Sequence, residues 1–324
     1  MGDAVLCTPT LKSLRTHFSS AKITFYANQI AKDTLSPTNL ADQWVIQKKQ
    51  NPFVQAAELK KINFSHAVLF KNSFASALTI FLARIPQRIG YTRQGRGLFL
   101  TDKIKPEKIN TRSFKPISMV DYYNRLAMHL GATQTSTKLQ LSIDPKSAES
   151  LKAKLTVENN RPIFIIVPGG TFGPSKQWPA ERFAETADAL IEKHNAQVFI
   201  SVSPAERKIA QQICDSSSHP LINLGEKNLT LGELKALFAK AALVISNDTG
   251  PRHIAIALNK KIVTLFGPNN PQWTETGYEN EIKIIANVPC SPCDKPVCKQ
   301  PQHLCMESIT TDMVLQAAEK LISN

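Results

Sequence analysis

The second half of the chain alternates short runs of β-branched and aromatic residues with segments of helical periodicity. This alternation is typical of βαβ units, in which helices join neighbouring parallel strands. Helices are predicted at about 179–194, 204–216, 230–239 and 250–258. Five runs predict the strands between them: Ile163–Val167, Gln197–Val202, Leu221–Asn223, Leu243–Ser246 and Ile262–Phe266. We therefore predict an α/β fold with a doubly wound parallel sheet.

The first half shows the same alternation less clearly, with strands predicted at Lys22–Ala27 and Ala67–Phe70 and helices at 73–84 and 117–131. The residues Met1-Gly2-Asp3 look like the loop that follows a first strand, and the helix after it would follow directly. The opening strand of a doubly wound domain is therefore missing. We expect either that the true start lies upstream of Met1 or that the fold dispenses with a central strand, which would leave its neighbours unpaired.

A polar stretch at 142–160 marks the predicted boundary between two domains. Residues 1–155 would form an N-terminal acceptor-binding domain and residues 156–324 a C-terminal donor-binding domain. The last helix, at about 310–322, is expected to pack back on the N-terminal domain. Two doubly wound domains that face each other would hold a ligand between the carboxyl ends of their strands.

The net charge of +13 is concentrated in the first half of the chain. Residues 1–155 hold 23 Lys and Arg against 9 Asp and Glu, whereas residues 156–324 hold 16 against 17. No acidic residue occurs between Glu58 and Asp102, a stretch with seven basic residues. Such a field attracts nucleic acid, phosphorylated lipid or an acidic membrane surface, and a plain solvated basic face is the simpler alternative.

A run of about 18 apolar residues, enough to span a bilayer, does not occur. Asp3, Lys12 and Arg15 interrupt any apolar core of a secretory signal. We expect a cytoplasmic protein, or one peripheral on the inner face of the membrane.

A glycine-rich loop, Val167-Pro-Gly-Gly-Thr-Phe-Gly-Pro-Ser-Lys-Gln-Trp-Pro179, follows one predicted strand and precedes a helix. Its backbone N–H groups suit phosphate oxygens, and Lys176 would add a charge on a departing diphosphate. The loop matches neither a Walker A motif nor a dinucleotide fingerprint. The alternative is an ordinary strand-to-helix turn with a solvated lysine.

A second such junction is Ser246-Asn-Asp-Thr-Gly-Pro-Arg-His253, which is followed by Ile262-Val-Thr-Leu-Phe-Gly-Pro268. Asp248 and Thr249 are candidates for the helix N-cap. The N-terminus of the helix presents unpaired N–H groups and partial positive charge, which suit a diphosphate. A helix cap alone would explain Asp248 but not the whole string.

These strings, taken in order, resemble glycosyltransferase family 9, the heptosyltransferases of lipopolysaccharide assembly. The resemblance also includes MGDAVLCTPTLKSLR at the start, LFKNSFASALTIFLARIPQRIGYTRQGRGLFLT and MVDYYNRLAMHLG, and the latter two are similar to the heptosyltransferase II branch. It covers essentially the whole chain. It implies the GT-B fold, two Rossmann-like domains that face a cleft.

The resemblance also implies roles for individual residues. Asp3 matches the aspartate thought to be the catalytic base, and Lys176 would stabilise the departing ADP. The alternative role of Asp3 is a helix N-cap, and that of Glu206 is a first-turn acid on the helix dipole. Implied donor contacts are Thr171, Lys176, Glu206, Asp248, Thr249, Gly250 and His253. Implied acceptor contacts are Asn72, Ser73, Arg88, Arg93 and Arg96.

The implied reaction is an inverting transfer of heptose from ADP-heptose to a Kdo-lipid A or heptosyl-Kdo-lipid A acceptor, without a required cofactor or metal. We expect a monomer in peripheral contact with the inner membrane. The alternatives are a transferase for another ADP- or UDP-sugar, an inactive relic that binds sugar nucleotides, and a basic nucleic-acid-binding protein. Aromatic residues make up only 7% of the chain, and the basic stretch lacks a base-stacking motif, so we expect no nucleic acid partner.

Four of the six cysteines cluster near the end of the chain: Cys290, Cys293, Cys298 and Cys305, with His303 among them. This content suits a structural zinc site, although the spacing is not that of a zinc finger. Reduced thiols in a surface loop, oxidation and an iron–sulfur site are the alternatives.

Overall fold

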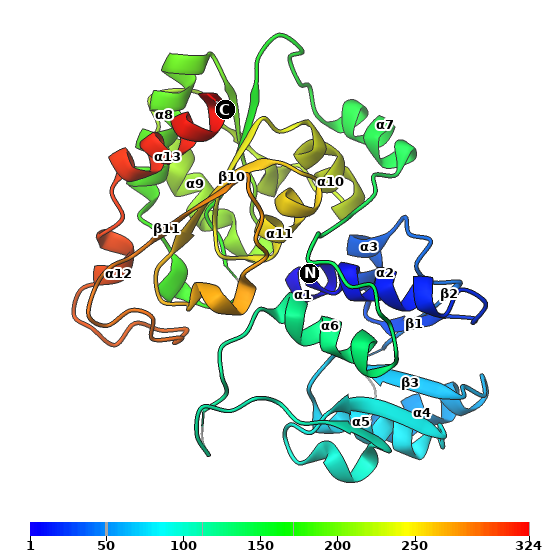
Figure 1. Cartoon of the computed structure of the whole chain (residues 1–324). Coiled ribbons are helices and arrows are strands. Elements are labelled where there is room, and N and C mark those ends of the chain that lie inside the picture. Colours follow the sequence, from blue (N-terminus) through cyan, green and yellow to red (C-terminus); the bar gives the residue numbers. More distant parts are fainter. Residues whose placement is uncertain (49–50, 112, 171, 324) are drawn as a thin grey trace.

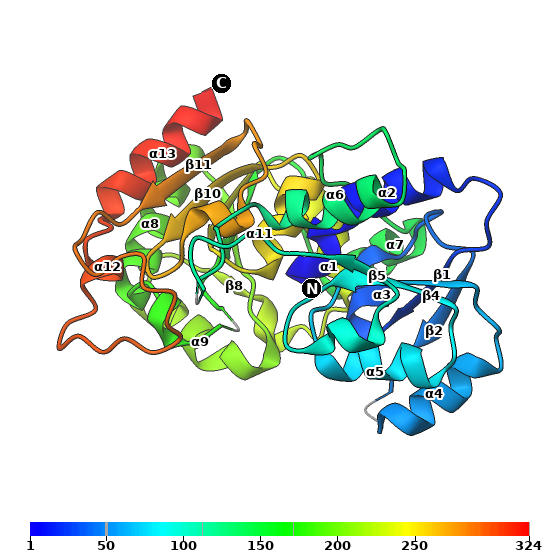
Figure 2. The same cartoon turned by 60° about the horizontal axis from the view of Figure 1, so that its bottom comes forward.

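The computed structural model describes residues 1–48, 51–111, 113–170 and 172–323, which form two α/β halves placed side by side (Figure 1, Figure 2). The C-terminal half contains one parallel sheet in the order β11-β10-β9-β6-β7-β8. Read from β6, this is the doubly wound order 3-2-1-4-5-6. The strands are β6 (Ile163–Val167), β7 (Gln197–Ile200), β8 (Ile222–Asn223), β9 (Leu243–Asn247), β10 (Lys261–Phe266) and β11 (Glu281–Ile285).

Helices cover both faces of this sheet because its strands are apolar on both faces. Phe164 and Ile166 of β6 pack in one apolar cluster with α8 and α13, whereas Ile165 and Val167 pack in another with α10 and α11. The helices are α7 (Pro145–Lys154), α8 (Ala180–His194), α9 (Arg207–Ser216), α10 (Leu231–Lys240), α11 (Gly250–Ala257), α12 (Leu304–Glu307) and α13 (Thr311–Ser323). Short 3₁₀ segments are η2 (Pro174–Lys176), η3 (Pro204–Glu206), η4 (Leu224–Glu226) and η5 (Pro271–Thr274).

The last helix differs from its expected position. The buried residues of α13, among them Val314 and Leu321, belong to the apolar cluster of the C-terminal sheet, and the helix packs on α8, β10 and β11. The expectation that it packs on the N-terminal half is therefore corrected: its apolar stripe covers the sheet face that α8 leaves open.

The N-terminal half contains two separate parallel sheets, β1-β2 and β3-β4-β5. In the doubly wound order the first strand lies between the second and the fourth, and β1 and β3 take those two positions. Among the described residues no strand joins β1 to β3, as expected from the missing opening strand. The strands are β1 (Thr24–Ala27), β2 (Gln43–Ile46), β3 (His66–Leu69), β4 (Gln87–Tyr91) and β5 (Asp102–Ile104).

The helices of this half are α1 (Gly2–Leu6), α2 (Thr8–His17), α3 (Gln29–Leu35), α4 (Pro52–Lys60), α5 (Phe74–Leu82) and α6 (Met119–His129), with the 3₁₀ segment η1 (Arg96–Phe99). The sequence patterns did not predict β2, β4, β5 or β11, because these strands are short and carry polar residues. Within the described ranges, no helix has both the length and the apolarity that a bilayer span requires.

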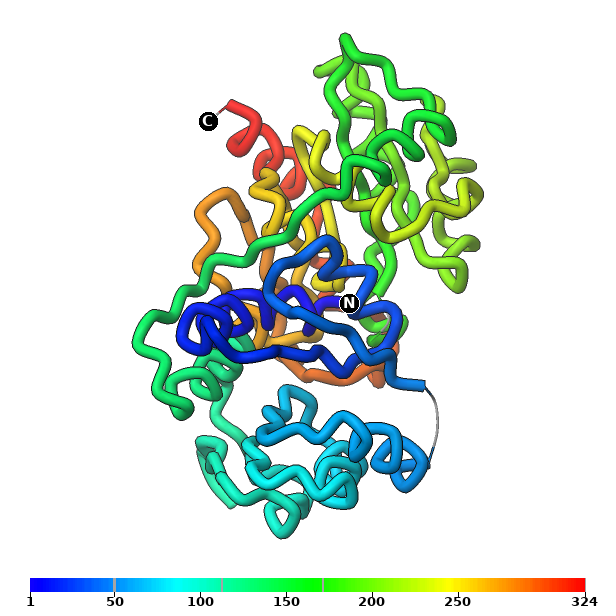
Figure 3. The backbone as a smooth tube through the Cα atoms, turned by 90° about the vertical axis from the view of Figure 1, so that its right-hand side faces the viewer, coloured from blue at the N-terminus to red at the C-terminus, as the bar shows by residue number. Residues whose placement is uncertain are grey.

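The two halves meet near the N-terminus, where helix α1 lies between them (Figure 3). Helix α1 packs against α11 of the C-terminal half. The buried Lys235 of α10 reaches into the N-terminal half, where its Nζ donates to the carbonyl oxygens of Thr34, at 3.0 Å, and of Ser36. Helix α7 packs on α10. Glu233 of α10 accepts a hydrogen bond from Ser150 of α7 at 2.6 Å and pairs with Lys154 of α7 at 2.8 Å. The boundary at residues 142–160 stays a prediction.

Candidate functional site

Two loops leave the C-terminal sheet at its topological switch point. Strands β6 and β9 are neighbours, and the chain winds from β6 toward β7 but from β9 toward β10. In a doubly wound sheet the connections at such a point lie on opposite faces, which opens a crevice at the carboxyl ends of the two strands. The loop 168–176 follows β6, and Asp248-Thr249 follows β9. Thr171 lies outside the described residues, so its predicted contact with the donor stays a prediction.

Lys176 and Asp248 join the two loops. The Lys176 Nζ donates to the Asp248 carbonyl oxygen at 2.6 Å and to its Oδ2 at 3.0 Å, and both side chains are less than 10% exposed. The ring of Phe172 lies 5.0 Å from the same Nζ. The two junctions predicted from the sequence therefore converge at one place.

Asp248 is the centre of a buried network of charges. Its Oδ1 accepts from Arg252 Nη1 at 3.1 Å and from Thr274 Oγ1 at 3.2 Å. Burial would raise the pKa of Asp248, but the charges of Lys176 and Arg252 lower it to about 2. The carboxylate is therefore ionised throughout the physiological pH range.

Arg252 continues this network to the far edge of the sheet. Its guanidinium is fully buried and donates to Glu281 of β11 through Nε at 2.6 Å and through Nη2 at 3.0 Å. Such a two-point pair satisfies a buried charge better than a single contact. Neither Arg252 nor Glu281 is among the site residues predicted from the sequence. The signal was an arginine in the middle of a helix-opening motif that is otherwise small or apolar.

Helix α11 begins at Gly250, two residues after Asp248. Thr249 is its N-cap residue, and among the described residues no side chain caps the first turn. Helix α1 approaches closely at this end: a Cβ built on Gly250 would lie 3.2 Å from the Met1 Sδ, so the close crossing favours glycine. Asp3, exposed in the first turn of α1, is thereby held beside the start of α11.

His253 is buried in the first turn of α11. Burial, and then the charge of Arg252, lowers the pKa of His253 to about 3, so the imidazole is neutral at physiological pH. Its Nδ1 has no hydrogen-bond partner among the described residues, and the same holds for the Oδ1 atoms of Asn247 and Asn269. Unpaired buried polar atoms are costly, and three of them gathered around Asp248 suit a site that a polar ligand completes.

Glu206 lies at the same edge of the sheet but is engaged within the protein. Its Oε1 accepts from Gly170 N at 2.7 Å, and its Oε2 accepts from Ser203 N at 3.0 Å. The second contact is part of a capping box at the start of η3. The carboxylate therefore occupies a backbone donor of the glycine-rich loop.

The acceptor residues predicted in the N-terminal half divide into two groups. Asn72 follows β3, and its Oδ1 accepts from Arg96 Nη2 at 2.8 Å and from the Tyr122 hydroxyl at 3.1 Å. Ser73 is the N-cap of α5, where its Oγ accepts from Ser76 N at 3.1 Å. Arg93 stacks on the ring of Phe114 at 3.9 Å.

Arg96 and Arg88 both donate to backbone carbonyl oxygens of the N-terminal half. Arg96 is completely buried and donates to the carbonyl oxygens of Tyr91 and Lys71 as well as to Asn72. Arg88 donates to the carbonyl oxygens of Phe99 and Ile85, at 2.6 and 2.5 Å. Because the guanidinium of Arg96 is completely buried, its predicted direct contact with an acceptor is corrected: Arg96 supports the loops. Arg88 is half-buried, and its predicted contact with an acceptor stays a prediction.

The cysteine-containing segment supports the loop that carries Lys176. Ser175 N donates to the Pro296 carbonyl at 3.1 Å, its Oγ donates to the Lys295 carbonyl at 2.6 Å, and His303 Nε2 lies 2.5 Å from the Ser175 carbonyl. Burial, and then the thiol of Cys290, raises the pKa of Cys305. In the described part of the chain, no group of three or more His, Cys, Asp or Glu is arranged to hold a metal ion.

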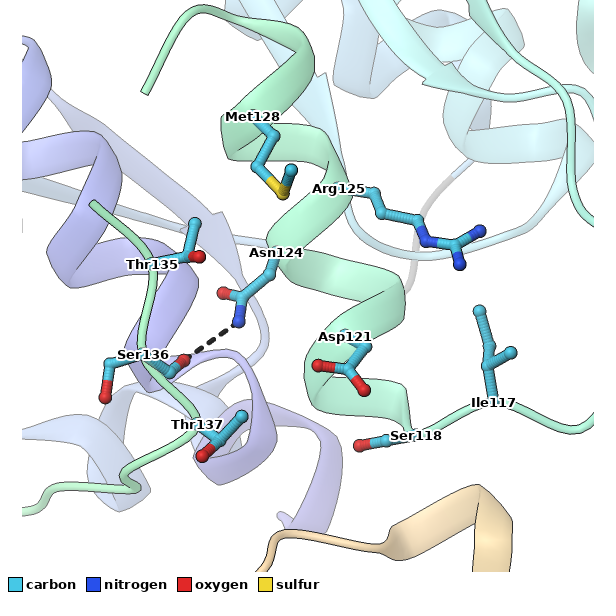
Figure 4. Close-up of a pocket in the computed structure, with 9 residues that line it drawn as sticks. All are labelled: Ile117, Ser118, Asp121, Asn124, Arg125, Met128, Thr135, Ser136 and Thr137. Carbon is cyan, nitrogen blue, oxygen red and sulfur yellow. Dashed lines mark hydrogen bonds between the residues drawn. The ribbon is translucent and has the colours of Figure 1, made fainter. Parts of the chain in front are cut away.

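A cavity of about 740 Å³ lies elsewhere, between α6 and residues 135–137 (Figure 4). Asn124 spans its floor: it accepts from Thr10 Oγ1 at 2.8 Å and donates to the Ser136 carbonyl at 2.8 Å. Asp121 points to the same side as Ser136 (Figure 4). None of the predicted site residues lines this cavity, so the switch point is the better candidate for the donor site.

Comparison with known proteins gives consistent relatives. A model of glycosyltransferase family 9 (heptosyltransferase) matches residues 55–303. The chain is 32% identical over 275 residues to lipooligosaccharide heptosyltransferase 2 of Haemophilus ducreyi. This match covers 79% of this chain and 76% of the relative. It is 26% identical over 330 residues to the enzyme of the same name from Campylobacter jejuni, covering 99% and 96% of the two chains.

The fold is similar to that of Escherichia coli ADP-heptose lps heptosyltransferase II. The TM-score is 0.81 at 24% sequence identity, and the match covers 99% of this chain and 96% of that chain. The predicted arrangement of two Rossmann-like domains is thereby confirmed.

Proposed function

The chain belongs to glycosyltransferase family 9, and from this membership we propose that it transfers a heptose from ADP-L-glycero-D-manno-heptose to the Kdo/heptose inner core of lipopolysaccharide. The resemblance to the heptosyltransferase II branch favours addition of the second heptose. The observation that carries the proposal is the contact of Lys176 with Asp248, which brings two anion-binding junctions together at the switch point.

The donor diphosphate binds between Lys176 and the start of α11. The helix contributes N–H groups and partial positive charge, and Lys176 contributes a full charge on the departing ADP. Asp248 fixes the lysine, and Thr249 and Gly250 form the floor of this site. His253, being neutral, acts by hydrogen bonding and not by charge. The carboxylate of Glu206 accepts hydrogen bonds from the ribose hydroxyls, and these replace its contact with Gly170 N.

Asp3 acts as the general base. Its carboxylate takes the proton from the acceptor hydroxyl as the acceptor oxygen forms a bond to the anomeric carbon. The bond from that carbon to the phosphate oxygen breaks on the opposite face, and ADP leaves with the electron pair. A single displacement of this kind inverts the anomeric configuration. Lys176 and the helix N-terminus stabilise the charge that develops on ADP, so the step needs no metal.

The acceptor binds in the N-terminal half at the carboxyl ends of β3 and β4. Asn72 and Ser73 contact its sugar hydroxyls, and Arg93 binds an anionic group. Arg96 and Tyr122 position Asn72, because both donate to its Oδ1. We further propose that the protein acts as a monomer at the cytoplasmic face of the inner membrane, where a lipid-linked acceptor is available.

A panel of donors and acceptors tests this proposal. The purified chain is incubated with ADP-heptose, UDP-sugars or GDP-sugars, together with Kdo-lipid A or heptosyl-Kdo-lipid A, and product is identified by mass spectrometry. We expect turnover with ADP-heptose and the heptosylated acceptor. Turnover with another nucleotide sugar alone would assign a different transferase, and ADP binding without any turnover would indicate a relic.

The zinc prediction for Cys290, Cys293, Cys298 and Cys305 is a separate proposal. The metal would tie down the segment that supports Ser175, and it would take no part in transfer. Metal analysis of the purified protein checks this: about one zinc per chain, lost in a Cys290→Ser and Cys293→Ser double variant, is the result expected for a four-cysteine site. Metal-free protein with unchanged stability would reject it.

A further inference from the structure

One surface of the N-terminal half exposes large apolar side chains next to basic ones. Helix α5 presents Phe74 at 47% exposure and Phe81 at 44%, and the neighbouring η1 presents Leu98 at 86%. Residues 74 and 81 are seven positions apart, so they lie on the same side of the helix, two turns from each other. Large exposed apolar groups gathered in this way mark an interaction surface more often than scattered ones do.

Ring contacts join three aromatic residues of this surface, and Leu98 precedes one of them, Phe99, in the chain. The ring of Phe99 lies 5.1 Å from that of Phe74 and 5.3 Å from that of Phe81. The guanidinium of Arg88 lies 5.5 Å from the ring of Phe81. We call Phe74, Phe81, Leu98 and Phe99 the aromatic patch.

Charge decides what kind of partner fits the aromatic patch. It lies within the stretch between Glu58 and Asp102, which contains no acidic residue. Arg84 is exposed two residues after the end of α5, and Lys71 is exposed three residues before its start. Exposed aromatic and branched residues surrounded by Lys and Arg suit the surface of an anionic bilayer, where rings enter the interface and cations meet lipid phosphates.

The patch also has a suitable position. Helix α5 lies on the side of the N-terminal half that faces away from the C-terminal sheet (Figure 1). It begins directly after Asn72 and Ser73, at the carboxyl end of β3. A bilayer on the patch would therefore lie beside the proposed acceptor residues and leave the donor junctions open.

We propose that the aromatic patch and the basic residues around it dock the protein on an anionic phospholipid bilayer, an inference that rests on the proposed function for its lipid-linked acceptor. Docking would present the acceptor headgroup at the carboxyl edge of β3, so diffusion along the membrane would replace capture from solution.

Vesicle co-sedimentation tests the proposal with the full chain. Vesicles of phosphatidylethanolamine and phosphatidylglycerol are compared with vesicles of phosphatidylcholine alone. We expect binding to the anionic vesicles, and a partition coefficient reduced by at least about tenfold in a Phe74→Ser and Leu98→Ser double variant. Arg84→Gln should weaken binding to the anionic vesicles alone. Soluble glycerol phosphate should not displace the protein, since it offers no apolar interface.

Matched controls lie in the C-terminal half, where Val297 and Met313 are 58% and 41% exposed. The Val297→Ser and Met313→Ser double variant, and Lys208→Gln on α9, should bind vesicles as the unmodified chain does. Transfer to a water-soluble, deacylated acceptor should be the same in all variants.

Equal vesicle binding by the patch variant and the control variant would overturn the docking surface. So would a dimer in light scattering that the patch variant converts to monomer, because the patch would then be a contact between two copies. Vesicle binding without any heptose transfer would leave the docking surface standing and reject the proposed function instead.

Discussion

Replacing Lys176 with methionine removes one charge from the buried network and little volume. Methionine keeps an apolar chain of similar length, so the cavity term is small. The Nζ contacts with the carbonyl oxygen and Oδ2 of Asp248, at 2.6 and 3.0 Å, are lost. Removing one partner of a buried pair costs about 3–5 kcal/mol when the other is left unpaired. Asp248 keeps Arg252 and Thr274, so the lower end applies.

The pKa of Asp248 gives a second bound on this cost. The pKa is lowered from 3.8 to about 2. Burial alone would raise it, and the charges of Lys176, of Arg252 and then of His253 lower it. A shift of this size corresponds to about 2–3 kcal/mol, which is the net of the stabilisation by these partners and the opposing cost of burial. Because the folded pKa is below the unfolded one, this stabilisation is complete above about pH 4 and is lost as the pH falls through about 2. We expect Lys176→Met to lower the free energy of unfolding by about 2–3 kcal/mol at pH 7.

Urea unfolding followed by circular dichroism measures this loss, and the exposed Lys208→Met serves as control. A double-mutant cycle with Asp248→Asn isolates the pair, with an expected coupling of about 1–2 kcal/mol. Titration calorimetry should show ADP binding weakened by about 10- to 100-fold in Lys176→Met, the loss expected for a charged hydrogen bond to phosphate. Additive effects in the cycle would refute the ion pair, and unchanged ADP affinity would refute the phosphate assignment.

Three further predictions follow from the same region. The pKa of His253 is about 3 in the folded protein and about 6.5 in the unfolded chain, so the stability of the fold decreases by up to about 1.4 kcal/mol per pH unit as the pH falls below about 6.5. His253→Leu should remove this part of the decrease between about pH 6.5 and 4.5. Urea unfolding midpoints measured across that range test it. Gly173→Ala should weaken ADP binding and lower stability, because a Cβ there would lie 2.2 Å from the Pro296 carbonyl oxygen. The control Gly277→Ala, also at positive φ but in open space, should leave ADP binding intact. Equal ADP affinities of the two variants would contradict this prediction. Asp3→Ala should lower turnover by at least about 100-fold in an ADP-release assay but preserve ADP binding, and persistent turnover would exclude Asp3 as the base.

The sequence predicted the elements that carry the donor site. All five strands expected in the second half are present, and so are the loops after β6 and β9. The reason is local: strand and helix periods, and the glycines and prolines that end them, are written in consecutive residues. In the first half, the residues Met1-Gly2-Asp3 were expected to follow a strand position, and among the described residues no strand joins β1 to β3.

Burial and long-range pairing were decided only by the tertiary structure. Arg88 and Arg96 look like surface cations in the sequence, yet folding turns both toward backbone carbonyls. Arg252 and Glu281 are 29 positions apart and meet because α11 packs on β10, which pairs in parallel with β11. A sequence pattern records the period of an element, but the partner of a charged side chain depends on which elements pack together, and that is settled by the whole fold.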